Sequence, residues 1–484
     1  VEYTDSVELD NIGALAKIYL YDPFPLIDKV ILSGSFMKET RKGGNMKDDI
    51  WDNPFASTSE LIETKRHEAG LSFHKYFGKN HTFKLAYNYS VHERRATNGA
   101  ILDDITTNPD PSGDWDTDAP KPLIANEKLH VADFVYSLPF KGGGQHVLLF
   151  GVQFTRSDFW QKIGQDNNST RQKTEKWAND FGVFIQDEYS PIKDLTIGFG
   201  VRFFYHKSKD EYVGTSTEYD EKRFNPRGSI KYNITKDLVA RATVGTGYKV
   251  PYHFAEDLHL CSGSPKIYKP GDLKPESSVS YTFGLDFYHK EMKLSFTAFR
   301  IDFNDKLSFE GSATVPSGYD NVWQNVGDAY SMGAEASFVF KFLNDMITVE
   351  GSYTFTDAQY KDLSGTDKYI KRVPKHTASL GVDIDYKGFM FTTDMKITGP
   401  MWITFDENGD NAPDPVNEET DWFVTVDARI AKKFVDGDKN EYEIFFGMKN
   451  IGGYVQPKKD YEDAAYMWAP FTGRTVYGGF RVKF

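Results

Sequence analysis

The chain ends in a segment, residues 473–484, in which apolar and polar side chains alternate with the period of two that is typical of a β-strand. Its apolar face is made of Val476, Phe480, Val482 and Phe484. Its other face is made of Tyr477, Gly479, Arg481 and Lys483. A strand of a transmembrane β-barrel requires this arrangement, because one face meets lipid and the other meets the lumen.

Similar alternating segments recur along nearly the whole chain, with clear examples at residues 81–92, 195–205 and 292–302. From residue 17 onward the pattern predicts about nineteen strands of roughly ten residues each, the length expected for a membrane-spanning strand. The sequence has no apolar run of about eighteen residues, so no transmembrane helix is expected. The predicted fold class is therefore all-β.

The connections between these segments fall into two classes that alternate along the chain. Short turns are expected at residues 77–80, 192–194, 235–237, 290–291, 343–345 and 387–388. Long polar loops are expected at residues 98–126, 161–176, 207–219, 252–277, 361–372, 406–420 and 452–472. This alternation predicts an antiparallel transmembrane β-barrel with short turns on one side and long loops on the other.

The direction of the strands bears on whether the barrel can close. The last strand runs toward the short-turn side, and the first clear strand, residues 15–21, runs the same way. Because an odd number of strands cannot close with both ends on one side, we expect at least one further strand upstream or hidden in residues 1–9. The chain is therefore expected to begin partway into a larger barrel.

Composition agrees with this fold and limits the function. The 484 residues include 38 Phe, 28 Tyr and 40 Gly, and the mean hydropathy of −0.53 fits strands that are wet on one face. The net charge of −13 argues against nucleic acid as a partner. Cys261 is the single cysteine, so no internal disulfide is expected. No catalytic arrangement or Gly-rich phosphate loop is visible, so we do not expect an enzyme.

Several short motifs follow one another in a set order. They are Gln186-Asp187-Glu188, Asn225-Pro226-Arg227, Gly247-Tyr248-Lys249-Val250-Pro251, Leu273-Lys274-Pro275-Glu276, Asn325-Val326-Gly327 with Gly333-Ala334-Glu335, Val373-Pro374-Lys375-His376, and Gly447-Met448-Lys449-Asn450. With the terminal strand, this series resembles the TonB-dependent outer-membrane receptors. The resemblance in motifs runs from about residue 180 to the C-terminus.

The resemblance implies a barrel of about twenty-two strands whose lumen is filled by a preceding plug domain. On this basis residues 1–484 form the barrel domain, and the plug and roughly the first three strands are missing from the chain. The implied location is the Gram-negative outer membrane, crossed many times, with the C-terminus in the periplasm. The implied partners are outer-membrane lipid, the protein's own plug, a TonB-type energy-coupling protein and a surface lipoprotein.

The function implied by the resemblance is energised uptake of a scarce nutrient, either an iron chelate or siderophore, haem, or cobalamin. Outer loops would capture the ligand, and the plug would gate its passage. The alternatives that the sequence leaves open are a passive porin or a structural barrel subunit of a larger outer-membrane complex, and, as a third reading, a soluble β-rich adhesin.

The loop at 252–277 supplies the sharpest substrate-binding candidates, which are Tyr252, His253, Glu256, Asp257 and His259. By resemblance to haem receptors, His259 lies between two motifs that flank a haem-contacting histidine, and imidazole is a common ligand of haem iron. The alternative is that His253 and His259 are ordinary loop residues in hydrogen bonds.

Loop tryptophans are a further set of candidates, comprising Trp115, Trp323, Trp402 and Trp468. Such side chains either line a binding vestibule or form the aromatic girdle that barrels place at the membrane interfaces. For Trp468, deep in a long loop, ligand binding is the reading that we carry forward as a candidate. For Trp402, near a strand end, the girdle is the expected role.

Two acidic loops have the spacing of oxygen ligands in calcium sites. The candidate ligands are Asp406, Asn408 and Asp410 in one loop, and Asp110, Asp114 and Asp116 in the other. Neither loop carries an acidic residue at the twelfth position, where the first has Asn417. The alternative is that both are solvated acidic loops without a metal, and no other cofactor is expected.

Overall fold

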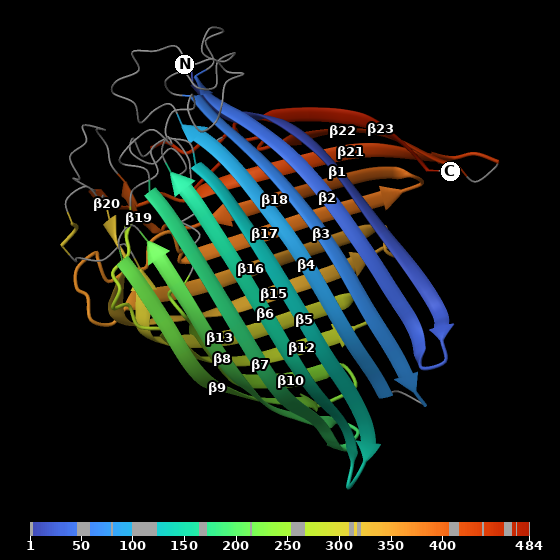
Figure 1. The fold of residues 1–484 in the computed structure, drawn as a ribbon. Helices are drawn as coiled ribbons and strands as arrows, with labels where there is room; N and C mark the ends of the chain where they lie inside the picture. The colour runs from blue at the N-terminus through green and yellow to red at the C-terminus, as the bar shows by residue number, and fades with distance from the viewer. Residues whose placement is uncertain are drawn as a thin grey trace.

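The computed structural model describes residues 3–45, 59–78, 81–98, 123–163, 172–212, 215–252, 267–308, 314–316, 321–405, 416–437, 440–458, 467–470 and 472–483. These residues form a curved antiparallel sheet of nineteen strands that encloses a lumen (Figure 1). Within the described ranges, no helix has the length and apolar character needed to cross a membrane.

One wall of the sheet is built from the first ten strands in chain order. They are β1 (Tyr3–Phe24), β2 (Ile27–Asn45), β3 (Ser59–Phe77), β4 (His81–Asn98), β5 (Leu123–Lys141), β6 (Gln145–Ile163), β7 (Gln172–Ile192), β8 (Leu195–Tyr212), β9 (Thr215–Asn233) and β10 (Leu238–Lys249). Figure 1 shows β1 to β9 in front of the lumen.

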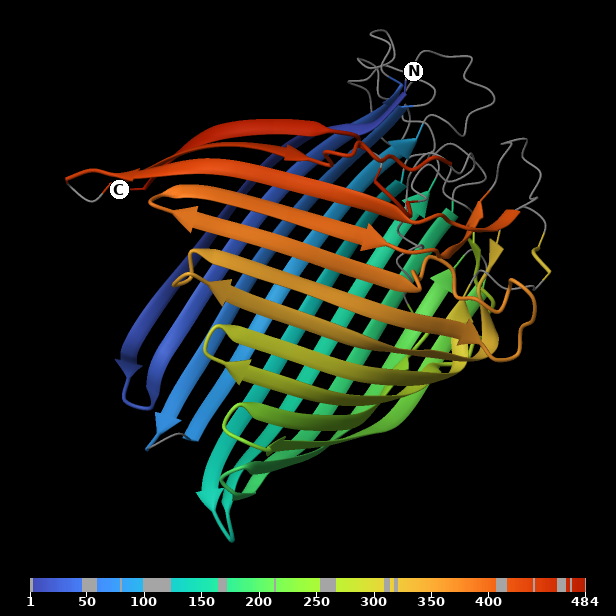
Figure 2. The ribbon, with the colours of Figure 1, turned by 180° about the vertical axis from the view of Figure 1, so that it is seen from behind.

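The opposite wall holds the remaining nine strands, which Figure 2 shows from behind. They are β12 (Glu276–His289), β13 (Met292–Ser308), β15 (Gln324–Phe342), β16 (Ile347–Tyr360), β17 (His376–Tyr386), β18 (Phe389–Thr398), β21 (Phe423–Val435), β22 (Glu441–Lys449) and β23 (Thr475–Lys483). Two small sheets lie in the connections: β11 (Ile267–Tyr268) pairs with β14 (Asn321–Val322), and β19 (Trp402–Phe405) pairs with β20 (Val416–Glu419).

Each strand of the large sheet pairs with its neighbour in sequence, so the prediction of about nineteen antiparallel strands is confirmed. Among the described residues β1 pairs only with β2, and β23 pairs only with β22. The first and last strands run in the same direction, as the sequence predicted, because an even number of connections separates them. The expectation that further strands and a plug precede this chain stays a prediction.

The predicted strand length is wrong for the first half of the sheet, where β1 to β9 have 18 to 22 residues. The stretch 207–219, expected to be a loop, instead continues the β8–β9 hairpin until Tyr212 lies opposite Thr215. Its polar residues pair across the strands, with Lys207 opposite Asp220 and Lys209 opposite Glu218. Opposite charges in such positions stabilise a hairpin that is polar on both faces, so its sequence looks like a loop.

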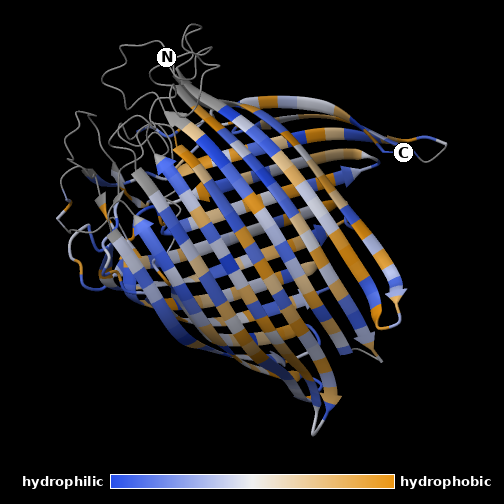
Figure 3. Cartoon of the chain, in the orientation of Figure 1, coloured by the Kyte–Doolittle hydropathy of each residue, from blue (hydrophilic) through white to orange (hydrophobic). Residues whose placement is uncertain are grey.

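The two faces of the sheet differ in polarity, as Figure 3 shows by the alternation of colours along each strand. Phe199 on β8 and Phe224 on β9 are 63% and 71% exposed. Arg202, on the opposite face of β8, donates a hydrogen bond to Gln153 Oε1 at 2.8 Å. An apolar outer face of this extent suits a hydrocarbon environment, and the polar inner face suits a lumen.

The closing strand has the predicted faces over its described part. Val476 and Phe480 are exposed on the outer face. On the inner face, Arg481 lies 3.9 Å from Glu443 and Lys483 lies 3.9 Å from Glu441, both on β22. Phe484 lies outside the described residues.

An aromatic cluster marks the outer face near the loop end of β16 and β17. The Tyr353 hydroxyl and His376 Nδ1 share a hydrogen bond of 2.7 Å, and the His376 ring stacks on Trp422 with centroids 5.4 Å apart. Trp422 is more than half exposed. The cluster occupies the place of an interfacial girdle, in which amphipathic rings sit between lipid and water.

We expect Ile185→Lys to lower the free energy of unfolding by about 2–4 kcal/mol, because it places an ammonium group on the lipid-facing side of β7. The matched control is Gln186→Lys, one residue further on and on the inner face, for which we expect less than about 1 kcal/mol. Denaturant unfolding from lipid bilayers measures both. Equal losses for the two variants would contradict the assignment of the faces.

Candidate functional site

A polar cluster lies on the inner face of β7, β8 and β9 near their loop ends. Strand alternation brings its members to one face, and the register sets them directly opposite each other, with Asp180 opposite His206, Lys176 opposite Asp210, and Ser208 opposite Tyr219. All except Asp180 are buried. Charged groups are rarely this buried unless they are paired, so we expect the members of this cluster to be paired with one another.

Ion pairs hold the centre of this cluster. Asp210 Oδ2 contacts Nζ of Lys176 at 3.5 Å and also contacts Nζ of Lys269, which comes from the connection between β10 and β12. The side chains of Lys176, Asp210 and Lys269 are 1%, 2% and 5% exposed. Removing one member of such a buried pair leaves its partner charged and desolvated, which is strongly destabilising.

His206 extends the cluster toward Tyr252. Its Nδ1 lies 2.6 Å from Asp180 Oδ1, and its Nε2 lies 2.7 Å from Ser208 Oγ. The ring meets the Tyr252 ring edge to face, with centroids 5.9 Å apart. Both ring nitrogens are therefore used in fixing the orientation of the imidazole.

Tyr252, predicted from the sequence to bind substrate, is the one candidate of its loop that the structure describes. Its carbonyl oxygen accepts a hydrogen bond from Lys269 Nζ at 3.0 Å, and its N–H donates to Val250 O at 2.8 Å. Burial raises the pKa of the Tyr252 phenol above its usual range, so the hydroxyl is neutral at physiological pH. Tyr252 thus belongs to the polar cluster on the inner face.

The other candidates of this loop and both calcium loops lie outside the described residues. They are His253, Glu256, Asp257, His259, Asp406, Asn408, Asp410, Asp110, Asp114 and Asp116. Their binding roles stay predictions. In the part of the chain that the structure describes, no group of three or more His, Cys, Asp or Glu side chains is arranged to hold a metal ion.

Trp468, in the connection between β22 and β23, packs against a separate apolar cluster. It packs against Phe423, with ring centroids 6.2 Å apart, and its backbone N–H donates to Gln456 Oε1 at 2.9 Å. Met401, Ile403 and Ala469 complete this cluster. Trp468 is partly buried there, and its role in binding stays a prediction.

Trp402 does not lie in the girdle on the outer face, and that expectation is wrong. It lies in the small β19–β20 sheet, where its ring stacks on Tyr369 with centroids 5.3 Å apart and planes 7° apart. Lys371 Nζ lies 5.7 Å from the centre of the indole ring. Trp323 is also buried within a connection, 4% exposed, beside Leu273 and Leu307.

Sequence reasoning missed Lys176, Asp210 and Lys269. The first two fall in stretches that were expected to be loops, and Lys269 contacts a strand about sixty positions away in sequence. Alternation gave no signal here, because residues 207, 209 and 211 are polar as well as residues 206, 208 and 210.

Comparison with known proteins adds to this geometry. A family model described as TonB dependent receptor-like, beta-barrel, matches residues 19–451. The iron-regulated outer membrane virulence protein of Vibrio cholerae is 26% identical over 245 residues, which cover 48% of this chain and 35% of that protein. The vitamin B12 transporter BtuB of Photobacterium profundum is 33% identical over 153 residues, covering 31% and 23%. The matched regions thus span about a third or less of these relatives' length.

Solved structures show the same fold at low sequence identity. The ferric-catecholate import receptor Fiu of Escherichia coli K12 has a TM-score of 0.71 at 15% identity, covering 99% of this chain and 75% of that chain. The ferric citrate transporter FecA, in its unliganded form, has a TM-score of 0.73 at 16% identity, covering 99% and 70%.

We expect Asp210→Asn to lower the free energy of unfolding by about 3–5 kcal/mol, because it removes the negative charge that contacts two buried ammonium groups. The control is Asp158→Asn on the outer face, whose half-exposed pair with Arg156 should be worth less than about 1 kcal/mol. Thermal melting in detergent compares the two variants. A loss at Asp210 no larger than that at Asp158 would show that the buried pairs contribute little.

Proposed function

We propose that this chain, which belongs to the TonB-dependent receptor β-barrel family, is the wall of an outer-membrane receptor for energised uptake of a scarce nutrient. The observation that carries the proposal is the family match across residues 19–451, together with a nineteen-stranded sheet that is apolar outside and polar inside. A polar inner wall suits a passage or a lumen-filling domain, and the apolar outer wall suits lipid.

The substrate that we propose is an iron chelate or siderophore, haem, or cobalamin. Support comes from the names of similar proteins, which include an iron-regulated outer membrane protein, a vitamin B12 transporter, and the ferrichrome outer membrane transporter/phage receptor of Escherichia coli K12. Those activities are properties of the relatives, and they define the set of probes to test here.

In the proposed mechanism, the loop end of the barrel faces the outside of the cell and captures the ligand. Tyr252 and Trp468 both lie in long connections at that end, and each contacts side chains of the barrel strands. A plug domain then moves under the action of a TonB-type protein and opens a path along the polar inner wall. The short-turn end, at which β23 ends, would face the periplasm.

Uptake by whole cells tests this proposal. The full-length protein that contains this chain is expressed in cells lacking their own receptors, and accumulation of radiolabelled ferric citrate, a ferric catecholate, haem and cyanocobalamin is followed with and without a protonophore. We expect one probe to accumulate, and the protonophore to abolish its accumulation, because transport by this family draws on energy from the inner membrane.

Passive behaviour would overturn the proposal. If none of the probes accumulates in an energy-dependent way, and purified protein instead makes liposomes permeable to small sugars, the chain is the wall of a porin. If neither is observed, a structural role in a larger assembly follows.

The haem option has its own test at His259. If His259 is a ligand of haem iron, adding haem to the wild type shifts the Soret band, and His259→Ala loses this shift. His253→Ala, the other candidate histidine of the loop, tests whether the shift depends on His259 alone. If the Soret band of haem is the same with and without the wild-type protein, haem is removed from the set of substrates.

A further inference from the structure

The connections that follow β10 and β13 are zipped together at the loop end. β11 and β14 pair in parallel, and the Trp323 N–H donates to Tyr268 O at 2.8 Å. The side chain of Asn325, at the start of β15, makes two hydrogen bonds to the backbone of the other connection. Its Oδ1 accepts the Lys274 N–H at 2.9 Å, and its Nδ2 donates to Lys274 O at 3.0 Å. These bonds fix the backbones of the two connections to each other.

Side chains make the zipped connections continuous with the barrel strands beneath them. Leu273 and Trp323 bury their apolar surfaces against Leu307 at the end of β13. Glu276, at the start of β12, accepts the Leu307 N–H at 2.9 Å and lies 3.3 Å from Lys306 Nζ. The two connections and the ends of β12 and β13 therefore behave as one packed unit, which we call the zipped rim (residues 267–276, 306–308 and 321–325).

Lys269 joins the zipped rim to a distant part of the wall. Its ammonium group contacts Asp210 on β8, and the sheet order places β9 and β10 between β8 and β12. The lysine therefore crosses the loop ends of two intervening strands on the inner face. It also donates to the carbonyl of Tyr252 at 3.0 Å, which ties Lys269 to the three described residues after β10, 250–252.

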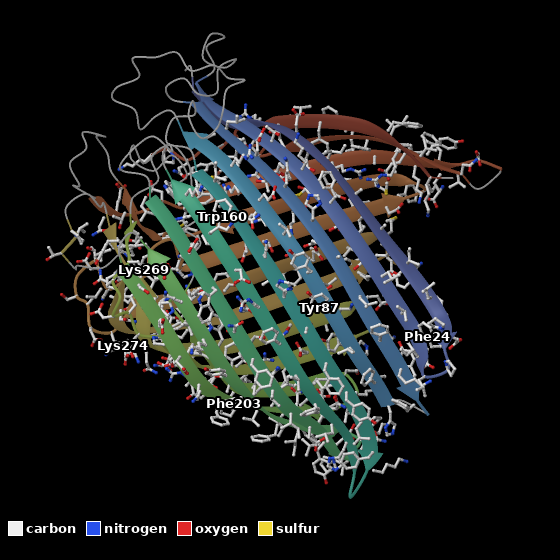
Figure 4. All side chains as sticks on the ribbon, in the orientation of Figure 1. Phe24, Tyr87, Trp160, Phe203, Lys269 and Lys274 are labelled. Atoms are coloured by element: carbon white, nitrogen blue, oxygen red, sulfur yellow. The ribbon has the colours of Figure 1, made fainter. Side chains whose placement is uncertain are left out.

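The Lys269–Asp210 ion pair is suited to joining the zipped rim to β8 reversibly. Asp210 is bound on the wall by Lys176 as well, so the carboxylate keeps a cationic partner when Lys269 leaves. The contact is buried, so salt screens it less than it screens an exposed pair. Lys274, five residues further along the same connection, is exposed (Figure 4 labels both lysines).

We propose that the Lys269–Asp210 pair is a lock that holds the zipped rim and residues 250–252 against the loop ends of β7, β8 and β9. Lys269 is a positioning residue: it sets where the loop end of one wall lies relative to the other. The lock requires no substrate. Its test is therefore independent of the test of the proposed uptake function.

Hydrogen exchange of the full chain in detergent tests the lock, with Lys269→Met compared to two matched variants. We expect Lys269→Met to speed exchange by about tenfold or more in peptides covering 267–275 and 321–325, because the rim opens more often from the wall. Lys274→Met makes the same chemical change at an exposed position and should exchange like the wild type. Lys176→Met removes the wall lysine alone, and we expect it to destabilise β7 and β8 while the Lys269 contact keeps exchange in the rim peptides close to that of the wild type.

Two results would overturn the lock. One is wild-type exchange in the rim peptides of Lys269→Met. The other is an equal acceleration in Lys176→Met, which would make Asp210 a support of the wall and not a tie to the rim. If Lys269→Met does not assemble, Lys269→Gln keeps a donor for the Tyr252 carbonyl while removing the charge, and the same two outcomes decide.

Discussion

The structure depends on one constraint, which is that backbone N–H and C=O groups within a membrane need partners in the protein itself. A sequential antiparallel sheet meets this need by pairing each of its interior strands on both sides, while β1 and β23 pair on one side among the described residues. Once the backbone is committed to strands, side chains must point alternately to the two faces. The contrast between exposed Phe199 and hydrogen-bonded Arg202 on one strand is the direct consequence.

The same constraint explains why buried polar side chains gather at the loop end. Within the membrane the outer face must be apolar, and so polar chemistry is confined there to the inner face. Beyond the membrane, β7, β8 and β9 continue as strands that are polar on both faces. A buried charge such as that of Asp210 is tolerated there because Lys176 and Lys269 pair with it. The connections then pack on this wall as structured elements, through the Lys269 contact and the Leu273–Trp323 cluster.

The period-two pattern made most of the fold predictable from the sequence. It predicted the faces of Val476 and Phe480, the antiparallel order and the approximate number of strands, because alternation is a local property of the chain. It failed at 207–219, where both faces are polar and the pattern no longer separates a strand from a loop. Of the polar cluster, Tyr252 was singled out by its loop, and its predicted role in substrate binding stays a prediction. Lys269 was not, because its partner is set by three-dimensional packing across two intervening strands.

The assignment of residues to the two faces of the sheet is the claim on which the rest is built, and spin labels on one strand test it most directly. Single cysteines at residues 182–187 of β7, in a Cys261→Ser background, carry a nitroxide in protein reconstituted into lipid. We predict that labels at 183, 185 and 187 collide mainly with dissolved oxygen, and those at 182, 184 and 186 mainly with a water-soluble nickel complex. Accessibilities without a period of two along β7 would contradict the account.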